Sequence, residues 1–505
     1  MGYLKKYTFE LISGLGIILF FFASRITTLL NLPIFTDEAI YIRWAQIASH
    51  DANWRLISLT DGKQPLFIWI TVIFMRFIND PLFSGRLVSV FAGFFTLVGL
   101  FFLGREVFKN RYIGLISSFL YAIYPFALVY DRMALYDSLV GTFAVWGLFL
   151  IVTVVRYARL DYAMLLGIVG GLGVLNKTSS FFTVYLLPFS LIIFDWKKKQ
   201  VSKRLVRFIT LSIVSVVMIY GMYSVLRLSP FFYIISQKDA IFVYPFSEWI
   251  QHPFAFFWSN LWVGQRDWFV KYFTIPFFVL VFTSFAINKN YFREKVLLTL
   301  WFLTPFIALA LFGKTLYPRY ILFMTLSLIP LVAYSAYFIM KKLESPLLQA
   351  VFLSAIIAVA LWKDYFILTD FSKASIPISD VTQYYTDWPS GYGIKETIQY
   401  LKKKEEKNEI KLYTQGTFGL MPDAYNIYLH NDKHFIIEGL WPITDKIPEE
   451  LKESAKIIPT YIVFYQPCPE CPAKGIAPSS WPLEVALQIK KPAHDSWITL
   501  YKIIK

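Results

Sequence analysis

Long apolar runs alternate with short basic segments along the first 366 residues of the chain. A helix needs about 20 mostly apolar residues to cross the hydrocarbon core of a bilayer, and many of the runs come close to that length. The pattern predicts about eleven membrane-spanning helices, near residues 9–30, 81–103, 112–130, 138–155, 161–176, 179–195, 205–228, 271–287, 295–313, 319–340 and 346–366. The apolar stretch 64–78 is on the short side for crossing, so it predicts an interfacial or re-entrant helix.

The basic segments favour this number of spans. With a cytoplasmic N-terminus, eleven spans place on the cytoplasmic side the segments "GREVFKNR", "RYARL", "WKKKQVSKR", "NKNYFREK" and "MKKLE". That distribution follows the positive-inside rule, whereas counting 64–78 as a twelfth span would put these segments outside. The extracytoplasmic face then holds the loop 31–80, the loop 229–270 and everything after about residue 367.

Beyond residue 370 the long apolar runs give way to charged residues, prolines, glycines and short alternating stretches. The segment "KETIQYLKKKEEK" predicts an amphipathic helix, and "EIKLYTQG", "HFIIEG" and "TYIVFYQP" predict short strands. We therefore expect two domains, a transmembrane domain over 1–366 and a small extracytoplasmic α/β domain over 367–505.

Composition fixes the broad class. Of the 505 residues, 56% are hydrophobic, which indicates a polytopic α-helical membrane protein. The net charge of +15 comes from basic clusters between apolar runs, so it indicates membrane topology and not a nucleic-acid partner. Cys468 and Cys471 are the two cysteines; a single CxxC lacks the second pair of a zinc ribbon, which leaves a local disulfide or two free thiols.

Two adjacent carboxylates, Asp37 and Glu38, directly follow the first apolar run in "IFTDEAIYIRW". The simple interpretation is helix capping, with Thr36 as the N-cap and acidic residues in the first turn. The alternative is that a carboxylate just outside the bilayer acts as a general base, with its pKa raised by partial desolvation. Tyr41 and Arg43 follow on the same segment and are candidates for the surrounding pocket.

Four further charged motifs fall on the predicted extracytoplasmic face. Snorkelling or a tight turn could explain each alone, although helix-dipole logic does not explain a cation at the start of a helix, as at Arg319. An anionic partner would explain the set, because cations stabilise a phosphate while a carboxylate deprotonates an acceptor. The motifs are "TDGKQPL" with Lys63, "VYDRMALYDS" with Arg132 and Asp137, "VLNKTSS" with Lys177, and "FGKTLYPRYIL" with Lys314, Arg319 and Tyr320.

These motifs resemble those of the GT-C superfamily of integral-membrane glycosyltransferases, in its protein O-mannosyltransferase and aminoarabinose-transferase branch. The segments "TDEAIY", "GKQPL", "DRMALYD", "LNKT" and "KTLYPRYIL" run in family order over residues 36–321. The sequence departs from the family at Gln64, where a proline is common, and it has neither a WWD-like tract nor a β-trefoil repeat.

The resemblance implies an inverting transfer of a sugar from a polyprenyl-phosphate carrier on the outer side of the membrane. It implies Asp37 as general base with Glu38 beside it, Asp137 and Arg132 completing the pocket, and contacts to the donor phosphate from Lys63, Lys177 and Arg319. Arg132, Lys314 and Tyr320 are also assigned to the donor-phosphate site. The acceptor is left open between protein, glycan and lipid.

Two alternatives remain open. Asp37, Glu38 and Asp137 could hold a divalent cation through their oxygen atoms, although the nearby cations could do the same electrostatic work. The protein could also be a transporter or flippase of lipid-linked saccharides. Transporters usually place polar groups near the bilayer midplane, whereas the charges here gather at one surface.

Overall fold

The computed structural model describes residues 2–404, 409–493 and 495–504. Contacts within the chain divide it into two units. The transmembrane unit comprises Met1–Thr27, Asn53–Ile70 and Arg86–Pro377, and the carboxy-terminal unit comprises Thr28–Ala52, Thr71–Gly85 and Ile378–Lys505. The sequence pattern predicted a single division near residue 366. The structure instead groups two early segments with the C-terminal residues, because pairing between distant segments leaves no mark on hydropathy.

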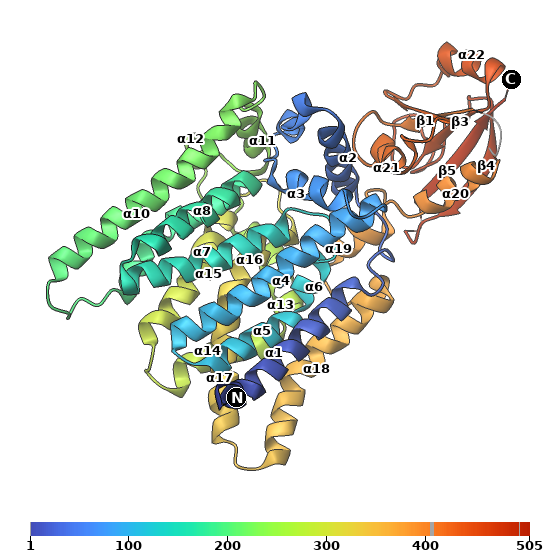
Figure 1. The fold of residues 1–505 in the computed structure, drawn as a ribbon. Helices are drawn as coiled ribbons and strands as arrows, with labels where there is room; N and C mark the ends of the chain where they lie inside the picture. The colour runs from blue at the N-terminus through green and yellow to red at the C-terminus, as the bar shows by residue number, and fades with distance from the viewer. Residues whose placement is uncertain (1, 405–408, 494, 505) are drawn as a thin grey trace. The chain divides into compact units, whose positions relative to one another are not determined.

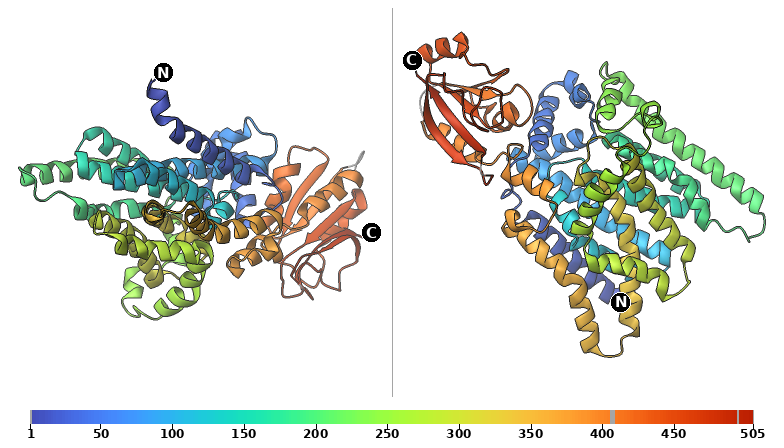
Figure 2. Two further views of the ribbon diagram at one scale, coloured as in Figure 1. Left: turned by 90° about the horizontal axis from the view of Figure 1, so that it is seen from below. Right: turned by 180° about the vertical axis from the view of Figure 1, so that it is seen from behind.

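Helices long and apolar enough to cross a membrane make up most of the transmembrane unit. In Figures 1 and 2 they run alongside one another. Seven segments of the described residues meet the length and hydropathy required, namely Thr8–Ile26, Pro81–Phe108, Asp137–Tyr157, Val201–Leu228, Phe292–Phe312, Pro318–Lys342 and Pro346–Thr369. These segments contain the helices α1 (Gly2–Ile26), α4 (Pro81–Phe108), α7 (Asp137–Tyr157), α10 (Val201–Ser224), α15 (Phe292–Phe312), α17 (Ile329–Lys342) and α18 (Pro346–Thr369). The polytopic α-helical class is therefore confirmed.

The other predicted spans are bent or built from shorter helices. Near 271–287, the helical segments Ser259–Phe273 and Ile275–Ile287 meet at 91°, and counting this pair gives eight spans, where the sequence pattern predicted about eleven. The remaining three are shorter or broken, and two of the breaks fall at prolines, which cannot donate a backbone hydrogen bond. They consist of α5 (Arg111–Ala122) with α6 (Pro125–Tyr130), of α8 (Leu160–Asn176), and of the short turns Thr178–Ile193. The apolar stretch 64–78 contains the ten-residue α3 (Leu66–Met75), which is too short to cross a bilayer; its predicted interfacial or re-entrant placement stays a prediction.

The long loop 229–270 is largely helical. It holds α11 (Ile234–Phe242), α12 (Phe246–Trp249) and most of α13 (Arg266–Phe273), which leads into α14 (Ile275–Ile287). The backbone after α11 pairs with the loop after α15, because the N–H of Tyr244 donates to the carbonyl of Phe312 at 2.7 Å and the N–H of Lys314 to that of Phe242 at 2.8 Å. These bonds fix α11 beside the loop that carries Lys314 and Arg319.

A five-stranded sheet forms the centre of the carboxy-terminal unit, in the order β2-β1-β3-β5-β4. The neighbours β2, β1 and β3 are parallel, whereas β5 is antiparallel to β3 and β4 to β5. The buried core lies between this sheet and α22, and includes Ile462, Phe464, Leu451 and Trp481. The elements are α2 (Thr36–His50), α20 (Ile394–Lys404), β1 (Ile410–Gln415), α21 (Leu420–Leu429), β2 (Phe435–Leu440), α22 (Glu449–Ile457), β3 (Thr460–Phe464), β4 (Leu483–Lys490) and β5 (Trp497–Ile503).

The predicted α/β fold of the C-terminal region is confirmed, including its first three strands. The predicted helix "KETIQYLKKKEEK" corresponds to α20 as far as Lys404, and its last three residues lie outside the described residues. Strands β4 and β5 were not predicted. β4 alternates poorly between buried and exposed positions because it lies at the edge of the sheet.

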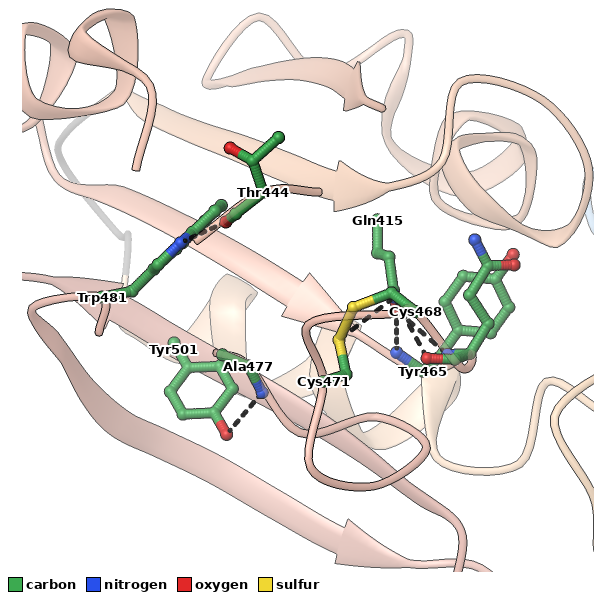
Figure 3. Close-up of a disulfide and its surroundings, with 9 residues drawn as sticks. Gln415, Thr444, Tyr465, Cys468, Cys471, Ala477, Trp481 and Tyr501 are labelled. Carbon is green, nitrogen blue, oxygen red and sulfur yellow. Dashed lines mark hydrogen bonds between the residues drawn. A yellow bond between two sulfur atoms is a disulfide. The ribbon is translucent and has the colours of Figure 1, made fainter. Parts of the chain in front are cut away.

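Cys468 and Cys471 form a disulfide in the loop after β3 (Figure 3), which settles the alternative that the sequence left open. The buried Gln415 at the end of β1 holds the backbone entering this loop. Its Oε1 accepts from the N–H groups of Tyr465 at 2.9 Å and Gln466 at 3.0 Å, and its Nε2 lies 3.9 Å from Sγ of Cys471.

Replacing both cysteines by serine is expected to destabilise the carboxy-terminal unit modestly. The bridge closes a loop of only a few residues, so loop entropy predicts a loss of about 2 kcal/mol. Hydrogen exchange of the full chain in detergent should show faster exchange over residues 460–475. Wild-type protein treated with dithiothreitol should match the double variant, and unchanged exchange in both samples would contradict a stabilising role.

Candidate active site

The first turn of α2 carries the acidic pair. Phe35, with extended backbone, occupies the N-cap position, so Thr36 is the first helical residue and not the cap. Glu38 is fully buried, and its Oε2 accepts from the N–H of Phe35 at 2.9 Å, which satisfies a backbone donor at the helix start. Asp37 is half-buried in the same turn. Capping therefore explains the burial of Glu38, and the predicted role of Asp37 as a base stays a prediction.

Arg43 and Tyr41 lie further along α2, which packs against α21. The guanidinium of Arg43 donates to Oε1 of Gln46 at 3.2 Å, and the amide of Gln46 donates to the carbonyl of Ile427 on α21 at 2.9 Å. Tyr41 is buried, with its ring 5.7 Å from that of Trp44. These contacts hold α2 on α21, and the predicted acceptor-pocket role of the two residues stays a prediction.

The carboxylate of Asp423, on α21, interacts electrostatically with the guanidinium of Arg43. Asp423 was not identified from the sequence as a candidate residue. Burial raises the pKa of Asp423 to about 7, while a backbone hydrogen bond from Gly419 and the charge of Arg43 act in the opposite direction. The pair makes α2 and α21 electrostatically complementary within the carboxy-terminal unit.

Lys63, in the transmembrane unit, follows Gly62, where the loop before α3 packs closely against α11. Gly62 has a φ of +68°, and a Cβ there would lie 2.6 Å from Cβ of Lys238 and 2.9 Å from the carbonyl oxygen of Ile234. Glycine is therefore required for α11 to pack on this loop. An ion pair of 2.5 Å between Lys238 and Asp61 joins the same two segments. Nζ of Lys63 lies 5.3 Å from the ring centroid of Phe242, at the end of α11.

Lys177, directly after α8, pairs with Asp137 at the start of α7. Their Nζ and Oδ1 atoms are 2.7 Å apart, and the Asp137 side chain is 7% exposed. Nζ of Lys177 also lies 4.8 Å from the ring centroid of Tyr320. This ring in turn meets Phe242 edge to face at 6.3 Å. Lys63, Asp137, Lys177 and Tyr320 thus gather in one region, although they come from four separate loops.

Hydrogen bonds tie the loops of this region together. The amide of Asn176 donates to the carbonyl of Tyr136 at 3.1 Å, and the Tyr136 hydroxyl donates to the carbonyl of Gln64 at 2.9 Å. The amide of Gln64 then donates to the hydroxyl of Thr178 at 2.7 Å. Gln64 therefore bridges two of the predicted motifs, at a position where the family that these motifs resemble often has a proline.

Asp239 on α11 also belongs to this region and was not predicted. Burial raises the pKa of its carboxyl, and a hydrogen bond from Thr178 and the charges of Lys63 and Lys177 partly oppose that effect. The signal in the sequence was weak, because "QKDA" lies in a long loop rich in aromatic residues. We call Lys63, Asp137, Lys177, Asp239 and Tyr320 the cation cluster.

Arg319 and Lys314 flank the cation cluster. The guanidinium of Arg319 lies 5.1 Å from the ring centroid of Tyr317 and 5.8 Å from that of Tyr320. Nζ of Lys314 is 3.1 Å from Glu248 and 4.5 Å from the ring centroid of Tyr244. Stacked aromatic rings orient both cations.

Arg132 has a contact pattern that differs from the predicted phosphate contact. Its Nη1 donates to the carbonyls of Ser24, Arg25 and Thr27 at 2.9, 3.3 and 2.7 Å, which satisfies the free carbonyls at the end of α1. The adjacent Asp131 is fully buried and accepts from the hydroxyls of Tyr121 and Ser138. We therefore propose a structural role for Arg132. Sequence alone could not separate it from Asp137, five residues later.

The divalent cation that the sequence left as an alternative has no fitting set of ligands in the part of the chain that the structure describes. No group of three or more His, Cys, Asp or Glu side chains there could hold a metal ion. Asp137, one of the three predicted ligands, already binds the ammonium of Lys177. No step is therefore assigned to a metal.

The family comparison covers part of the chain. Residues 62–220 match the family model of the dolichyl-phosphate-mannose-protein mannosyltransferases. This range contains Lys63, Asp137 and Lys177 and stops before Asp239. A comparison with curated protein sequences finds no match.

Solved structures cover nearly the whole chain at low identity. ArnT from Cupriavidus metallidurans in the apo state is 12% identical, with 99% of this chain and 98% of that chain covered and a TM-score of 0.60. The same protein bound to undecaprenyl phosphate gives 12%, the same coverage and 0.57. The oligosaccharyltransferase AglB from Archaeoglobus fulgidus, in complex with an inhibitory peptide and a dolichol-phosphate, gives 14%, 91% of this chain, 70% of that chain and 0.52. The chain thus has the fold of the GT-C integral-membrane glycosyltransferases, and over residues 62–220 it resembles the dolichyl-phosphate-mannose-protein mannosyltransferases.

Proposed function

We propose that the protein is a membrane glycosyltransferase that moves a sugar from a polyprenyl-phosphate donor to an acceptor at the extracytoplasmic surface. The observation that carries this proposal is the cation cluster, in which Lys177 lies beside the ring of Tyr320 and Lys63 beside the ring of Phe242, and these two rings meet edge to face. In the proposed topology the N-terminus is cytoplasmic, and the carboxy-terminal sheet is extracytoplasmic.

Lys63, Lys177 and Arg319 are proposed to bind the donor phosphate. Charge-assisted hydrogen bonds from lysine and arginine are the usual means of holding phosphate in proteins. The phosphate becomes the leaving group, so cations fixed around it stabilise the charge that develops as the bond to the sugar breaks. The ion pair with Asp137 fixes the ammonium of Lys177 in advance of donor binding.

Asp37 is proposed as the general base, on the strength of its motif and the resemblance. It would take the proton from the acceptor hydroxyl or amine while the acceptor forms a bond to the anomeric carbon. The bond from that carbon to the phosphate oxygen breaks in the same displacement, which inverts the anomeric configuration. The oxygen that leaves remains on the polyprenyl phosphate.

Two structural neighbours support the donor class. One has undecaprenyl phosphate bound and another a dolichol-phosphate, and both share the fold of this chain. We accordingly propose a polyprenyl-phosphate sugar as donor, with the acceptor drawn from protein, glycan or lipid.

Lipids that co-purify with the protein provide the direct test. Mass spectrometry should detect a polyprenyl phosphate or its sugar-linked form, and incubation with acceptor extracts should release the sugar-free carrier. Retention of such a lipid together with its movement between the leaflets of proteoliposomes, without any release of sugar, would instead favour a flippase.

Replacing Asp239 by Asn is expected to tighten binding of polyprenyl phosphate above the raised pKa of that carboxyl. Deprotonation of Asp239 adds a negative charge beside Lys63 and Lys177, so wild-type affinity should fall as pH rises through this pKa. Asn cannot ionise, and its affinity should exceed the wild-type value roughly threefold to tenfold at high pH. Binding isotherms over a pH series should converge at low pH, and parallel curves would contradict the placement of Asp239 beside the phosphate.

A further inference from the structure

A short backbone segment, residues 387–391, lies directly against the start of α2 within the carboxy-terminal unit. We call these residues the strap. The carbonyl of Pro389 accepts from both the N–H of Thr36 at 3.2 Å and its hydroxyl at 2.9 Å. The N–H of Gly391 donates to the carbonyl of Ile34 at 2.7 Å, and Phe35 and Ser390 form an antiparallel bridge. The strap therefore fixes the backbone on the N-terminal side of Asp37.

Lys491, the residue after β4, holds the strap from its other side. Its Nζ donates to the carbonyl of Ser390 at 2.5 Å and lies 3.4 Å from those of Asp387 and Trp388. The residue is only 2% exposed. Lysine is rarely buried to this extent unless it is paired, because moving an ammonium out of water costs several kcal/mol. The carbonyls of Asp387, Trp388 and Ser390 compensate the cost of burying the ammonium. They can do so together only in the conformation of the strap in which all three point towards Lys491.

Two further contacts fix the strap. The carboxylate of Asp387 accepts from the N–H of Trp388 at 2.7 Å and from Nζ of Lys474 at 3.1 Å. At the other end, a Cβ on Gly391 would lie 2.5 Å from Cγ2 and 2.7 Å from the carbonyl oxygen of Ile34. The strap can therefore approach residue 34 this closely only with glycine at position 391.

We infer that Lys491 is a positioning residue for Asp37, acting through the strap and Thr36. This inference rests on the proposed role of Asp37 as general base. It gives the C-terminal α/β domain a task in the reaction, which is to hold the first turn of α2 in place. A general base displaced by about 1 Å can lose roughly 100-fold in rate, so a loosened strap should slow the chemical step while donor binding persists.

The variant Lys491→Met keeps most of the side-chain volume and removes the ammonium. We expect kcat to fall roughly 10- to 100-fold, with KM for the polyprenyl-phosphate donor unchanged, since the proposed phosphate-binding cations belong to the transmembrane unit. Lys491→Arg, which still carries donors for the carbonyls, should recover part of the loss. Lys490→Met removes the same charge from the neighbouring exposed position and should leave both constants unchanged.

A double variant separates this inference from the proposed function. If Asp37→Asn is inactive, adding Lys491→Met should have no further effect on residual transfer, because both changes act through the same carboxylate. A multiplicative loss in the double variant, or full activity of Lys491→Met beside an inactive Asp37→Asn, would overturn the positioning role alone. Full activity of Asp37→Asn would overturn the base assignment itself.

A second variant tests the strap if Lys491→Met fails to fold. Gly391→Ala forces the strap away from Ile34 without touching the buried lysine. It should give the same loss of kcat with an unchanged KM. Equal losses in donor affinity and kcat in this variant would indicate a general structural defect and contradict the inference.

Discussion

Asp37→Asn is expected to lower the rate of sugar transfer by roughly 10²- to 10⁴-fold, the usual contribution of a general base. Asparagine has nearly the same shape as aspartate and cannot accept a proton from the acceptor. The start of α2 should stay intact, because the hydrogen bonds from Phe35 to Glu38 and from Thr36 to Pro389 hold it in place. The measurement is the single-turnover rate at saturating donor, together with the affinity for polyprenyl phosphate, which should not change.

Glu38→Gln is the matched control, one residue away. Glu38 accepts a hydrogen bond from the N–H of Phe35, and glutamine can still accept it through its amide oxygen. We therefore expect a small loss of thermal stability and a transfer rate within a few-fold of wild type. If Glu38→Gln were inactive and Asp37→Asn active, the two carboxylates would have exchanged roles.

Lys177→Met is expected to have the second largest effect, a weakening of polyprenyl-phosphate binding by roughly 10- to 100-fold. A hydrogen bond to a charged group contributes about 1.5–3 kcal/mol, which corresponds to that range. The loss should be greater than for a simple cation, because the carboxylate of Asp137 would remain buried, unpaired and close to the phosphate. Dissociation constants for polyprenyl phosphate in detergent micelles provide the measurement.

The double variant Lys177→Met with Asp137→Asn distinguishes stability from binding. It removes both members of the ion pair, so thermal stability should return towards the wild-type value while donor affinity stays low. Lys289→Met, at an exposed position between α14 and α15, controls for the loss of one positive charge. Recovery of affinity in the double variant would show that Lys177 serves only to neutralise Asp137.

Much of the candidate site could be predicted from local sequence. Lys177 interrupts an apolar run, and Lys63 and Arg319 each stand at the start of one, where a charge next to lipid needs a reason. Their motifs also occur in the order of a known superfamily, and the fold comparison agrees with it. Asp239 was missed because its short segment in the long loop has no such contrast with its neighbours.

Hydropathy and periodicity by themselves determined the polytopic helical class, the α/β character of the C-terminal region and most of the charged positions at the candidate site. These properties depend on residues within about 20 positions of one another, which a single sequence displays directly. The pairing of Lys177 with Asp137, the carbonyl contacts of Arg132 and the bend of 91° between α13 and α14 were decided only in three dimensions. The contact of Lys491 with the strap belongs to the same group, because it joins residues about a hundred positions apart. Such contacts arise from packing between distant segments, and no local pattern in the sequence encodes which distant segment will be the neighbour.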